Sequence, residues 1–469
     1  MSNKPESATK VGYLWQHRRF PRTILNRRFH PCRAARHPAC WSLLLTFVLL
    51  AAGGRAQNSD TRLRWWKGNL HTHSLWSDGD DFPEMIVDWY KEHGYQFLAL
   101  SDHNILLQGD KWIEATNNRG GAVALEKYLK RFGTNWVQLR EAKGKRQVRL
   151  KTLSEFRRLF EEPGRFLLIQ NEEITDKFRS KPVHVNATNL RDLIKPQGGN
   201  SVLQVMQNDV NAVFEQHRRT GQPMFPHLNH PNFGWAVTAE DFMQVKGERF
   251  FEVYNGHPAV HNEGDAIHIS SDRLWDIVQT MRLTEFGQGP LYALAVDDSH
   301  NYHKQSSSNS NPGRGWVVIR APELTATSIV AAMEAGDFYA SSGVRLKDVR
   351  RGKDRYEIEI EPEDGVTYTT QFIGTRKGFD RKSEPLLDSQ GEPLPVTRRY
   401  SQDIGAVLAE VEGTTPGYTL KGDEIYVRAR ITSSKLKANP YAKGEFERAW
   451  TQPLVTGRAS ATSERESGH

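Results

Sequence analysis

Short apolar runs that alternate with helix-like stretches constrain the fold of this 469-residue chain most strongly. The runs have the length of buried strands, and several stretches between them carry the apolar period of a helix. Strands that alternate with helices predict an α/β fold, with a parallel sheet closed into a barrel. We expect strands over 67–71, 96–101, 166–171, 182–188, 223–227, 250–255, 291–296 and 316–320. We expect helices over 83–94, 124–132, 153–160, 202–220 and 270–281.

Changes in composition divide the chain into parts. Residues 104–165 interrupt the alternation and are rich in Lys, Arg, Trp and Gly. We interpret them as an insertion that caps one face of a barrel domain at 57–345, with ordinary surface packing as the alternative. Alternating polar and apolar residues with recurrent Gly and Pro predict a smaller all-β accessory domain over 346–455. The Ser-, Arg- and Glu-rich residues 456–469 are expected to form a disordered tail.

The basic excess of the chain lies in its first 56 residues. The whole sequence carries a net charge of +7, but residues 1–56 hold ten Lys or Arg and one acid, so the remainder carries −2. An apolar run follows at 41–52, too short to cross roughly 30 Å of hydrocarbon. Small residues then lead to Ala56. This order predicts a signal peptide cleaved near Ala56 and a secreted or periplasmic protein; an uncleaved membrane anchor at 41–52 is the alternative.

The same distribution of charge and cysteine bears on partners and ligands. Because the part after the leader is mildly acidic, we expect no nucleic-acid binding. We also expect no membrane span after cleavage. Both cysteines, Cys32 and Cys40, lie in the leader, so the mature chain would offer a metal ion only nitrogen and oxygen ligands. The sequence does not determine the oligomeric state.

Histidines and carboxylates recur at the ends of the expected strands. His71 and His73 end the first strand, and Asp298 and His300 follow the strand at 291–296. Residues i and i+2 of a strand point to the same side, and the carboxyl ends of barrel strands share one mouth. One His-x-His is a weak signal, but its recurrence in related forms predicts a metal centre. Imidazole and carboxylate ligands suit Zn, Mn or Fe.

Four segments resemble the motifs of the PHP (polymerase and histidinol phosphatase) superfamily. Residues 69–74 (NLHTHS) with 77–79 (SDG) are similar to the first motif, and residues 100–104 (LSDHN) to the second. Residues 172–175 (EEIT) look like the third motif and 298–300 (DSH) like the fourth. The resemblance implies a distorted (β/α)7 barrel, similar to a TIM barrel, that holds three divalent metal ions.

The resemblance also implies a set of nine ligands. One ion would be held by His71, His73, Glu173 and Asp298; a second by Glu173, His184 and His230; a third by Asp78, His103 and His300. Glu172 and His227 are competing choices. We prefer Glu173 because it precedes the Ile-Thr of the family pattern, and His230 because the family favours His before Pro.

Two further residues are candidates for catalytic roles. Neighbours in a strand point apart, so Asp102 is expected to orient a ligand histidine while His103 binds the metal, with a turn cap as the alternative role. Arg314, between Gly313 and Gly315, is a candidate to bind a substrate phosphate with its fork of donors. A solvated loop arginine is the alternative there.

These features favour a secreted metal-dependent hydrolase. The leading interpretation is hydrolysis of a small-molecule or cell-surface phosphoester, either a monoester or a diester, by a metal-activated water at a trinuclear site. A first alternative is hydrolysis of an amide or lactone bond, because fold does not determine substrate; two or more Arg or Lys converging on the metals would favour phosphate. A second alternative is an extracellular carbohydrate-binding protein, which a row of exposed aromatic residues on the β-rich part would favour.

Overall fold

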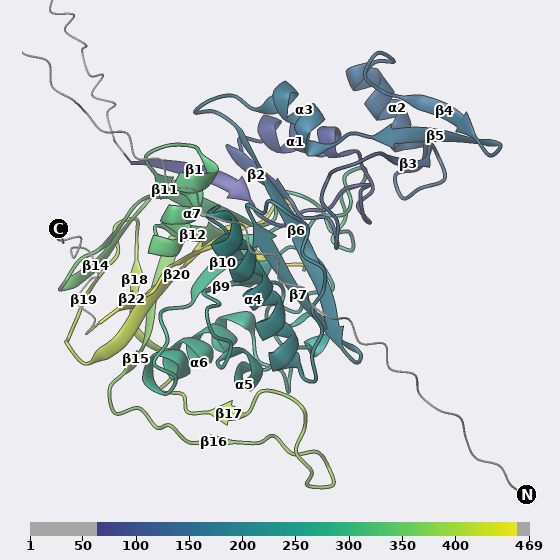
Figure 1. Cartoon of the computed structure of the whole chain (residues 1–469). Helices are drawn as coiled ribbons and strands as arrows, with labels where there is room; N and C mark the ends of the chain where they lie inside the picture. The colour runs from purple at the N-terminus through teal and green to yellow at the C-terminus, as the bar shows by residue number, and fades with distance from the viewer. Residues whose placement is uncertain (1–62, 457–469) are drawn as a thin grey trace, which may run out of the picture. The chain divides into compact units, whose positions relative to one another are not determined.

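A mixed sheet of fourteen strands runs through residues 63–456, the part of the chain that the computed structural model describes (Figure 1). The predicted leader and nearly all of the predicted tail lie outside these residues. The strands are, in spatial order, β10 (Tyr292–Val296), β9 (Phe250–Asn255), β8 (Phe225–Leu228), β7 (Lys181–Thr188), β6 (Leu167–Phe178), β2 (Phe97–Leu100), β1 (Arg64–Asn69), β11 (Trp316–Ala321), β12 (Phe338–Ser341), β21 (Phe446–Thr451), β20 (Glu424–Leu436), β15 (Tyr368–Arg376) and β18 (Ala406–Glu412), with β22 (Leu454–Val455) beside β20.

The row from β1 to β10 curves so that its strands enclose a common core. Buried apolar side chains of β1, β2, β6, β8, β9 and β10 meet there with those of helix α7 (Ala326–Ala335). The expected closed barrel is not formed as a continuous ladder. Just beyond the ends of β1 and β10, the chain is joined by a single parallel bridge between Thr72 and Ser299.

The expectation of a parallel sheet is wrong at β11, which pairs antiparallel with β1, and at β7. Strand β7 pairs antiparallel with both β6 and β8. On one side of it the strands run parallel to one another (β1, β2 and β6), and so do those on the other side (β8, β9 and β10). Only Arg179 and Ser180 connect β6 to β7. A connection of two residues produces a hairpin, whereas parallel neighbours need a long crossover.

Three helices on the outside lie where they were predicted: α1 (Pro83–Glu92), α4 (Val202–Thr220) and α6 (Ser271–Thr284). Helix α5 (Ala239–Phe242) and a short 3-10 turn, η1 (Phe233–Trp235), were not predicted. The start of α4 is readable in the sequence, because the Ser201 side chain accepts a hydrogen bond from the Gln204 N–H. Among residues 63–456, no helix combines the length and the apolar character needed to cross a bilayer.

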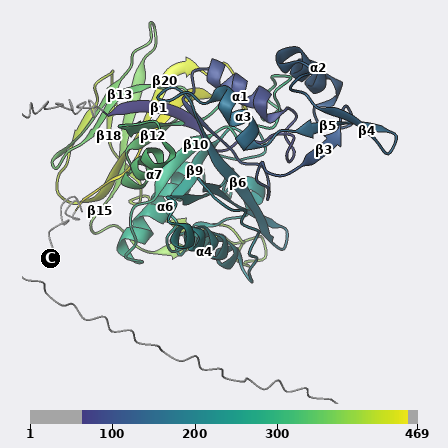
Figure 2. The same cartoon turned by 45° about the horizontal axis from the view of Figure 1, so that its top comes forward.

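The insertion at 104–165 packs beside α1, on the outside of the curved sheet. It contains β3 (Lys111–Glu114), α2 (Gly121–Phe132), β4 (Leu139–Ala142), β5 (Lys145–Leu150) and α3 (Leu153–Phe160), and Figures 1 and 2 show α2 and β3–β5 projecting to one side. Its apolar side chains share a core with α1 and Trp76. Trp76 Nε1 also donates to the Lys151 carbonyl at 3.1 Å. The insertion therefore supports the loop that carries Asp78.

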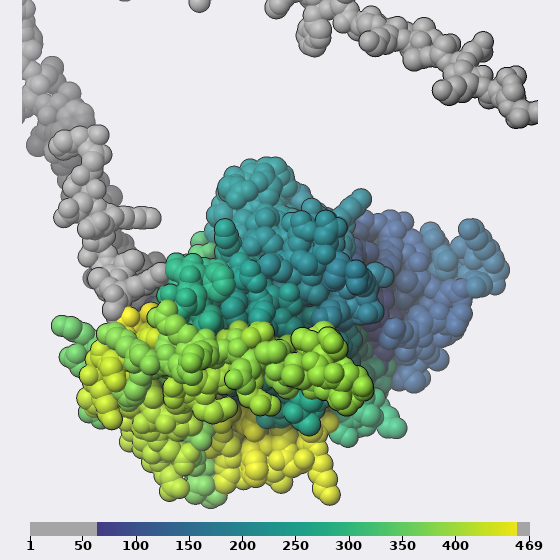
Figure 3. Space-filling model, turned by 90° about the horizontal axis from the view of Figure 1, so that it is seen from below, coloured from purple at the N-terminus to yellow at the C-terminus, as the bar shows by residue number. Residues whose placement is uncertain are grey.

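A separate C-terminal all-β domain is not confirmed. The region after 345 is β-rich as expected, with the additional strands β13 (Leu346–Arg351), β14 (Arg355–Ile360), β16 (Ser383–Glu384), β17 (Arg399–Tyr400) and β19 (Gly417–Thr419). However, β21 pairs with β12 and continues the large sheet. The segment with β16 and β17 also runs beside α5 and α6 (Figure 1) and forms a light-green band across the face seen in Figure 3. Its Tyr400 hydroxyl donates a hydrogen bond to Glu240 of α5 at 2.9 Å.

Candidate metal centre

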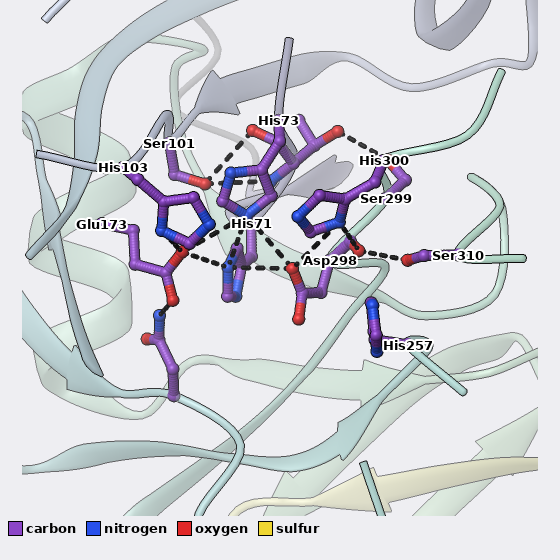
Figure 4. Close-up of polar contacts among 12 residues, drawn as sticks. His71, His73, Ser101, His103, Glu173, His257, Asp298, Ser299, His300 and Ser310 are labelled. Carbon is purple, nitrogen blue, oxygen red and sulfur yellow. Dashed lines mark hydrogen bonds and ion pairs between the residues drawn. The ribbon is translucent and has the colours of Figure 1, made fainter. Parts of the chain in front are cut away.

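Nine histidine and carboxylate side chains converge near the carboxyl ends of β1, β2, β8 and β10, and all of them except His71 and His73 line a pocket of about 160 Å³. Figure 4 shows His71, His73, His103, Glu173, Asp298 and His300. The nitrogen and oxygen atoms of the nine side chains form overlapping groups in which all ligand atoms lie within 4.8 Å of one another. The nine are the residues singled out by the sequence motifs: His71, His73, Asp78, His103, Glu173, His184, His230, Asp298 and His300.

The most buried ligands are His71, His73, Glu173 and Asp298, which belong to two overlapping groups, one of His71, His73 and Glu173 and one of His71, His230 and Asp298. The Nε2 atoms of His71 and His73 lie 3.1 Å apart. Each of them lies between 3.1 and 3.4 Å from Asp298 Oδ1 and from Glu173 Oε2. Imidazole nitrogens and carboxylate oxygens in such close groups are the ligands that zinc and similar divalent ions prefer. The donor atoms and their spacing therefore fit a divalent ion.

Glu173 connects this group to a second one through its other oxygen. Glu173 Oε1 lies 2.8 Å from His184 Nδ1 and 3.3 Å from His230 Nε2. The same oxygen accepts a hydrogen bond from Asn229 Nδ2 at 2.8 Å. One buried carboxylate thus faces two sets of imidazoles, which is the position of a bridging ligand.

Asp78 is the centre of the third group, on the more exposed side of the pocket. Its Oδ1 lies 3.3 Å from His300 Nε2, 3.5 Å from His103 Nε2 and 3.7 Å from His73 Nδ1. His73 Nδ1 is buried and has no hydrogen-bond partner among the described residues, which fits a role near a cation. A neutral imidazole has one free lone pair, so His73 serves the first group or this one, but not both.

The carboxylates give the centre a field that attracts positive charge. Burial lowers the pKa of His71, but Asp298, Glu252 and Glu173 outweigh this effect and hold the pKa well above its usual value. For His103, too, burial is outweighed by carboxylates, Glu173 first, and its pKa rises to about 9. Protons and metal ions compete for the same lone pairs. Groups that favour protonated imidazole also favour a bound cation.

Two of the nine residues, His230 with a φ of +20° and Asp298, have a positive φ. Asp298 has a φ of +48°, a left-handed conformation that residues other than glycine seldom adopt. The hydrogen bond from the Asp298 N–H to the His71 carbonyl, 3.0 Å long, holds the residue in place. Strain of this kind gathers at functional sites, where the surrounding structure maintains it.

The carboxylate that orients His71 is not among the residues predicted from the sequence. Glu252, in β9, lies with Oε1 2.6 Å from His71 Nδ1 and 3.2 Å from His227 Nε2, and its Oε2 accepts from the His230 N–H at 2.8 Å. A hydrogen bond at Nδ1 selects the tautomer and turns the other ring nitrogen toward a metal. A signal was present in the sequence, because Glu252 is the single charged residue of β9.

The structure also distinguishes the preferred ligands, Glu173 and His230, from the alternatives Glu172 and His227. Glu172 points to the opposite side of β6 from Glu173, and its Oε1 accepts from the Ile194 N–H at 2.7 Å. Burial raises its pKa to about 8. His227 lies beside Glu252, whereas His230 contacts Glu173.

The expected histidine-orienting role of Asp102 is wrong, and the alternative holds. Its Oδ1 accepts from the Ser74 N–H at 2.9 Å and from the Ser77 hydroxyl at 2.6 Å. Its Oδ2 accepts from the Ser74 hydroxyl at 2.7 Å. Asp102 therefore caps the turn that leads to Asp78.

The expected phosphate contact of Arg314 is also wrong. The side chain is buried, and backbone carbonyls occupy all three of its nitrogens. Nη1 donates to Gly256 and Asn309, Nη2 to Ser306, and Nε to Asn439. Arg314 thus ties the loop after β10 to the C-terminal strands and has no donor left for a substrate.

Comparisons with known proteins give distant matches only. No family model and no curated protein matches the chain. Among solved structures, a two-domain Bacteroides vulgatus protein containing a predicted PHP-like metal-dependent phosphoesterase is 15% identical, with a TM-score of 0.35 over 84% of this chain and 96% of that one. An amidohydrolase from Chromobacterium violaceum, with bound sulfate and no metal, is 13% identical, with a TM-score of 0.25 over 50% of this chain and 88% of that one.

Proposed function

We propose that the chain is a secreted metal-dependent hydrolase of the PHP superfamily, and that phosphoesters are its substrates. The overlap of the three ligand groups carries the proposal: Glu173 offers one oxygen to His71 and His73 and the other to His184 and His230. Ions bound to these groups would be neighbours. Neighbouring divalent ions lower the pKa of a water molecule and neutralise charge that develops on phosphoryl oxygens. The distorted (β/α)7 barrel and the three ions are part of this proposal.

A larger cleft beside the pocket suits an ester with a second anionic group. The cleft has a volume of about 810 Å³ and shares His184 and Phe233 with the pocket. Lys177 and Arg179, both exposed, line it from the β6–β7 hairpin. These cations would attract negative charge on the leaving group or beyond it. We therefore expect phosphodiesters, or monoesters with an anionic leaving group, to be better substrates than small monoesters whose leaving group carries no charge.

Hydrolysis of an amide or lactone is the second candidate. The pocket itself is lined by no Lys or Arg among the described residues, and Arg119 approaches only its edge, with Nη2 4.0 Å from Asp78 Oδ2. Two or more Lys or Arg side chains close to the ligands would favour a phosphate substrate, and of these only Arg119 comes near them in the part of the chain that the structure describes. Carbohydrate binding has less support, because Phe446 is the one exposed aromatic side chain within residues 346–456 and forms no row.

A substrate panel tests the proposal. The protein is stripped with chelator, reloaded with Mn²⁺ or Zn²⁺, and assayed against p-nitrophenyl phosphate, bis(p-nitrophenyl) phosphate, a p-nitroanilide and a lactone. We expect metal-dependent turnover of the phosphoesters. Turnover of the anilide or lactone alone would favour the second candidate instead.

A matched pair of variants locates the reaction. Asp298→Asn removes a ligand charge and should lower phosphoester turnover by at least about 100-fold. Asp265→Asn removes an exposed carboxylate that lies outside the ligand groups and contacts His268 at 2.9 Å. It should leave turnover unchanged. Equal activity in Asp298→Asn and the wild-type protein would mean that hydrolysis occurs elsewhere.

A further inference from the structure

His257 lines the metal-centre pocket but belongs to none of the ligand groups found in residues 63–456. It follows β9, and its ring centroid lies 5.4 Å from that of His300 and 6.3 Å from that of Phe233. Figure 4 shows it beside Asp298 and His300, across from His71 and His103. A histidine in this position has access to whatever enters the pocket.

A backbone group determines which ring nitrogen of His257 carries the proton. The N–H of Ala259 donates a hydrogen bond to His257 Nδ1 at 3.1 Å. A backbone amide nitrogen can only donate, so Nδ1 is the acceptor and holds no proton. A neutral imidazole has one N–H, which must therefore be at Nε2. This nitrogen offers a hydrogen bond and has no free lone pair.

Two ligand histidines have the opposite arrangement. His71 Nδ1 faces the Glu252 carboxylate at 2.6 Å, and His300 Nδ1 faces the Asp298 carbonyl oxygen at 2.9 Å. These partners are acceptors, so the proton is on Nδ1 and the lone pair of Nε2 is free for a cation. His257 cannot bind a cation through Nε2 unless the bond from Ala259 breaks. It is a donor in a pocket built from acceptors.

The loop holds this donor at a defined place relative to a ligand carboxylate. The His257 N–H donates to Asn255 Oδ1 at 2.8 Å, and its carbonyl accepts from the Val260 N–H at 3.0 Å. Asn255 is itself fixed, because its Nδ2 donates to Asp298 Oδ2 at 3.1 Å and to Glu252 Oε2 at 2.8 Å. The position of His257 is therefore coupled to the position of Asp298.

We propose that the pocket contains an oxyanion-binding position, in which His257 Nε2–H donates a hydrogen bond to a non-bridging oxygen of a tetrahedral phosphoryl group. The identity of the anion rests on the proposed phosphoesterase function. A neutral imidazole is too weak an acid to protonate a leaving group, so its contribution is the hydrogen bond alone. Such a donor stabilises charge that grows in the transition state. His257 would thus touch the substrate, while the nine ligands hold the metal.

Two variants and a matched control test the assignment. His257→Ala removes the donor, and His257→Gln keeps an N–H of similar reach. His261→Ala changes an exposed histidine of the same loop that stacks on Trp235 with ring centroids 4.5 Å apart, outside the pocket. For each protein, bound Mn²⁺ is counted by mass spectrometry, kcat and KM are measured with p-nitrophenyl phosphate, and the binding of inorganic phosphate is measured by calorimetry.

We expect His257→Ala to bind as much Mn²⁺ as the wild-type protein, to lose roughly 10- to 100-fold in kcat/KM and to bind phosphate at least about 10-fold more weakly. His257→Gln should recover part of both losses, and His261→Ala should match the wild type. Loss of a bound ion in His257→Ala would make His257 a ligand and overturn the proposal, as would unchanged phosphate binding and kinetics. If the wild-type protein hydrolysed no phosphoester, the proposed function would fail, while the comparison of phosphate binding would still decide the role of His257.

Discussion

Glu252 holds three parts of the centre at once, the rings of His71 and His227 and the backbone N–H of His230. We expect Glu252→Gln to lower the affinity for Mn²⁺ by about 10- to 100-fold, because the amide replaces a charged acceptor of two imidazoles. Mass spectrometry after dialysis against a series of Mn²⁺ concentrations measures this.

A second buried glutamate provides the control for that change. Glu248 is buried, which raises its pKa to about 8, and it lies outside the ligand groups found in residues 63–456. Glu248→Gln should therefore leave the Mn²⁺ affinity unchanged. Equal affinities in the two variants would show that Glu252 does not position the ligands.

Some functional residues could be identified from the sequence and others could not. The difference lies in the position of the groups that they contact. The predicted ligands follow strand ends, so a two-residue repeat is enough to aim His71 and His73 at one point. The partners of Arg314 are carbonyls from distant loops, including that of Asn439. No pattern of side chains reveals such acceptors. The tautomer of His257 likewise depends on a single backbone N–H in a loop.

Whole elements were predictable where local signals agree. The helices α3 and α4 occupy the predicted 153–160 and 202–220, and each begins at a side-chain cap. The strands β3 and β4 were missed because they are only partly buried and lack a clear alternation of apolar and polar residues. The direction of β7 was missed because the predicted strand ends at residue 171, whereas β6 continues to Phe178, so the two-residue connection to β7 was not recognised.

Helix α4 carries a buried aspartate, Asp209, whose ionisation should change the free energy of unfolding with pH. Asp209 Oδ1 accepts from the Gln197 N–H at 3.0 Å, but Oδ2 has no hydrogen-bond partner among the described residues. Burial, with a smaller contribution from Asp176, raises its pKa to about 8. The folded protein keeps this proton to higher pH than the unfolded chain does, so the stability it contributes is complete below about pH 4 and is lost as pH rises toward 8.

Asp209→Asn should remove that dependence. The variant and the wild-type protein should have similar melting temperatures at pH 4, and at pH 9 the variant should be more stable by about 5 kcal/mol. Thermal unfolding followed by circular dichroism across this range measures the difference. Parallel curves for the two proteins would show that Asp209 ionises normally in the fold.

At the scale of the whole molecule, the β6–β7 hairpin brings exposed cations to a cleft that opens beside the metal centre. We expect Lys177→Gln/Arg179→Gln to raise KM about 5- to 10-fold for a phosphodiester with an additional anionic group, with little change for p-nitrophenyl phosphate. Lys143→Gln/Arg146→Gln, in the β4–β5 hairpin of the insertion, removes the same charge outside that cleft and should change neither KM. Equal effects of the two double variants would indicate a general loss of positive charge instead of a substrate contact.

The central claim is that the converging histidines and carboxylates form a metal centre that hydrolyses phosphoesters. The most direct measurement is a titration of chelator-stripped protein with Mn²⁺, in which bound metal and turnover of bis(p-nitrophenyl) phosphate are followed together. We predict no turnover without metal, and turnover that rises as ions bind and reaches its maximum when the sites are full. Undiminished turnover by protein shown to contain no metal, or full occupancy without hydrolysis of any phosphoester, would contradict the claim.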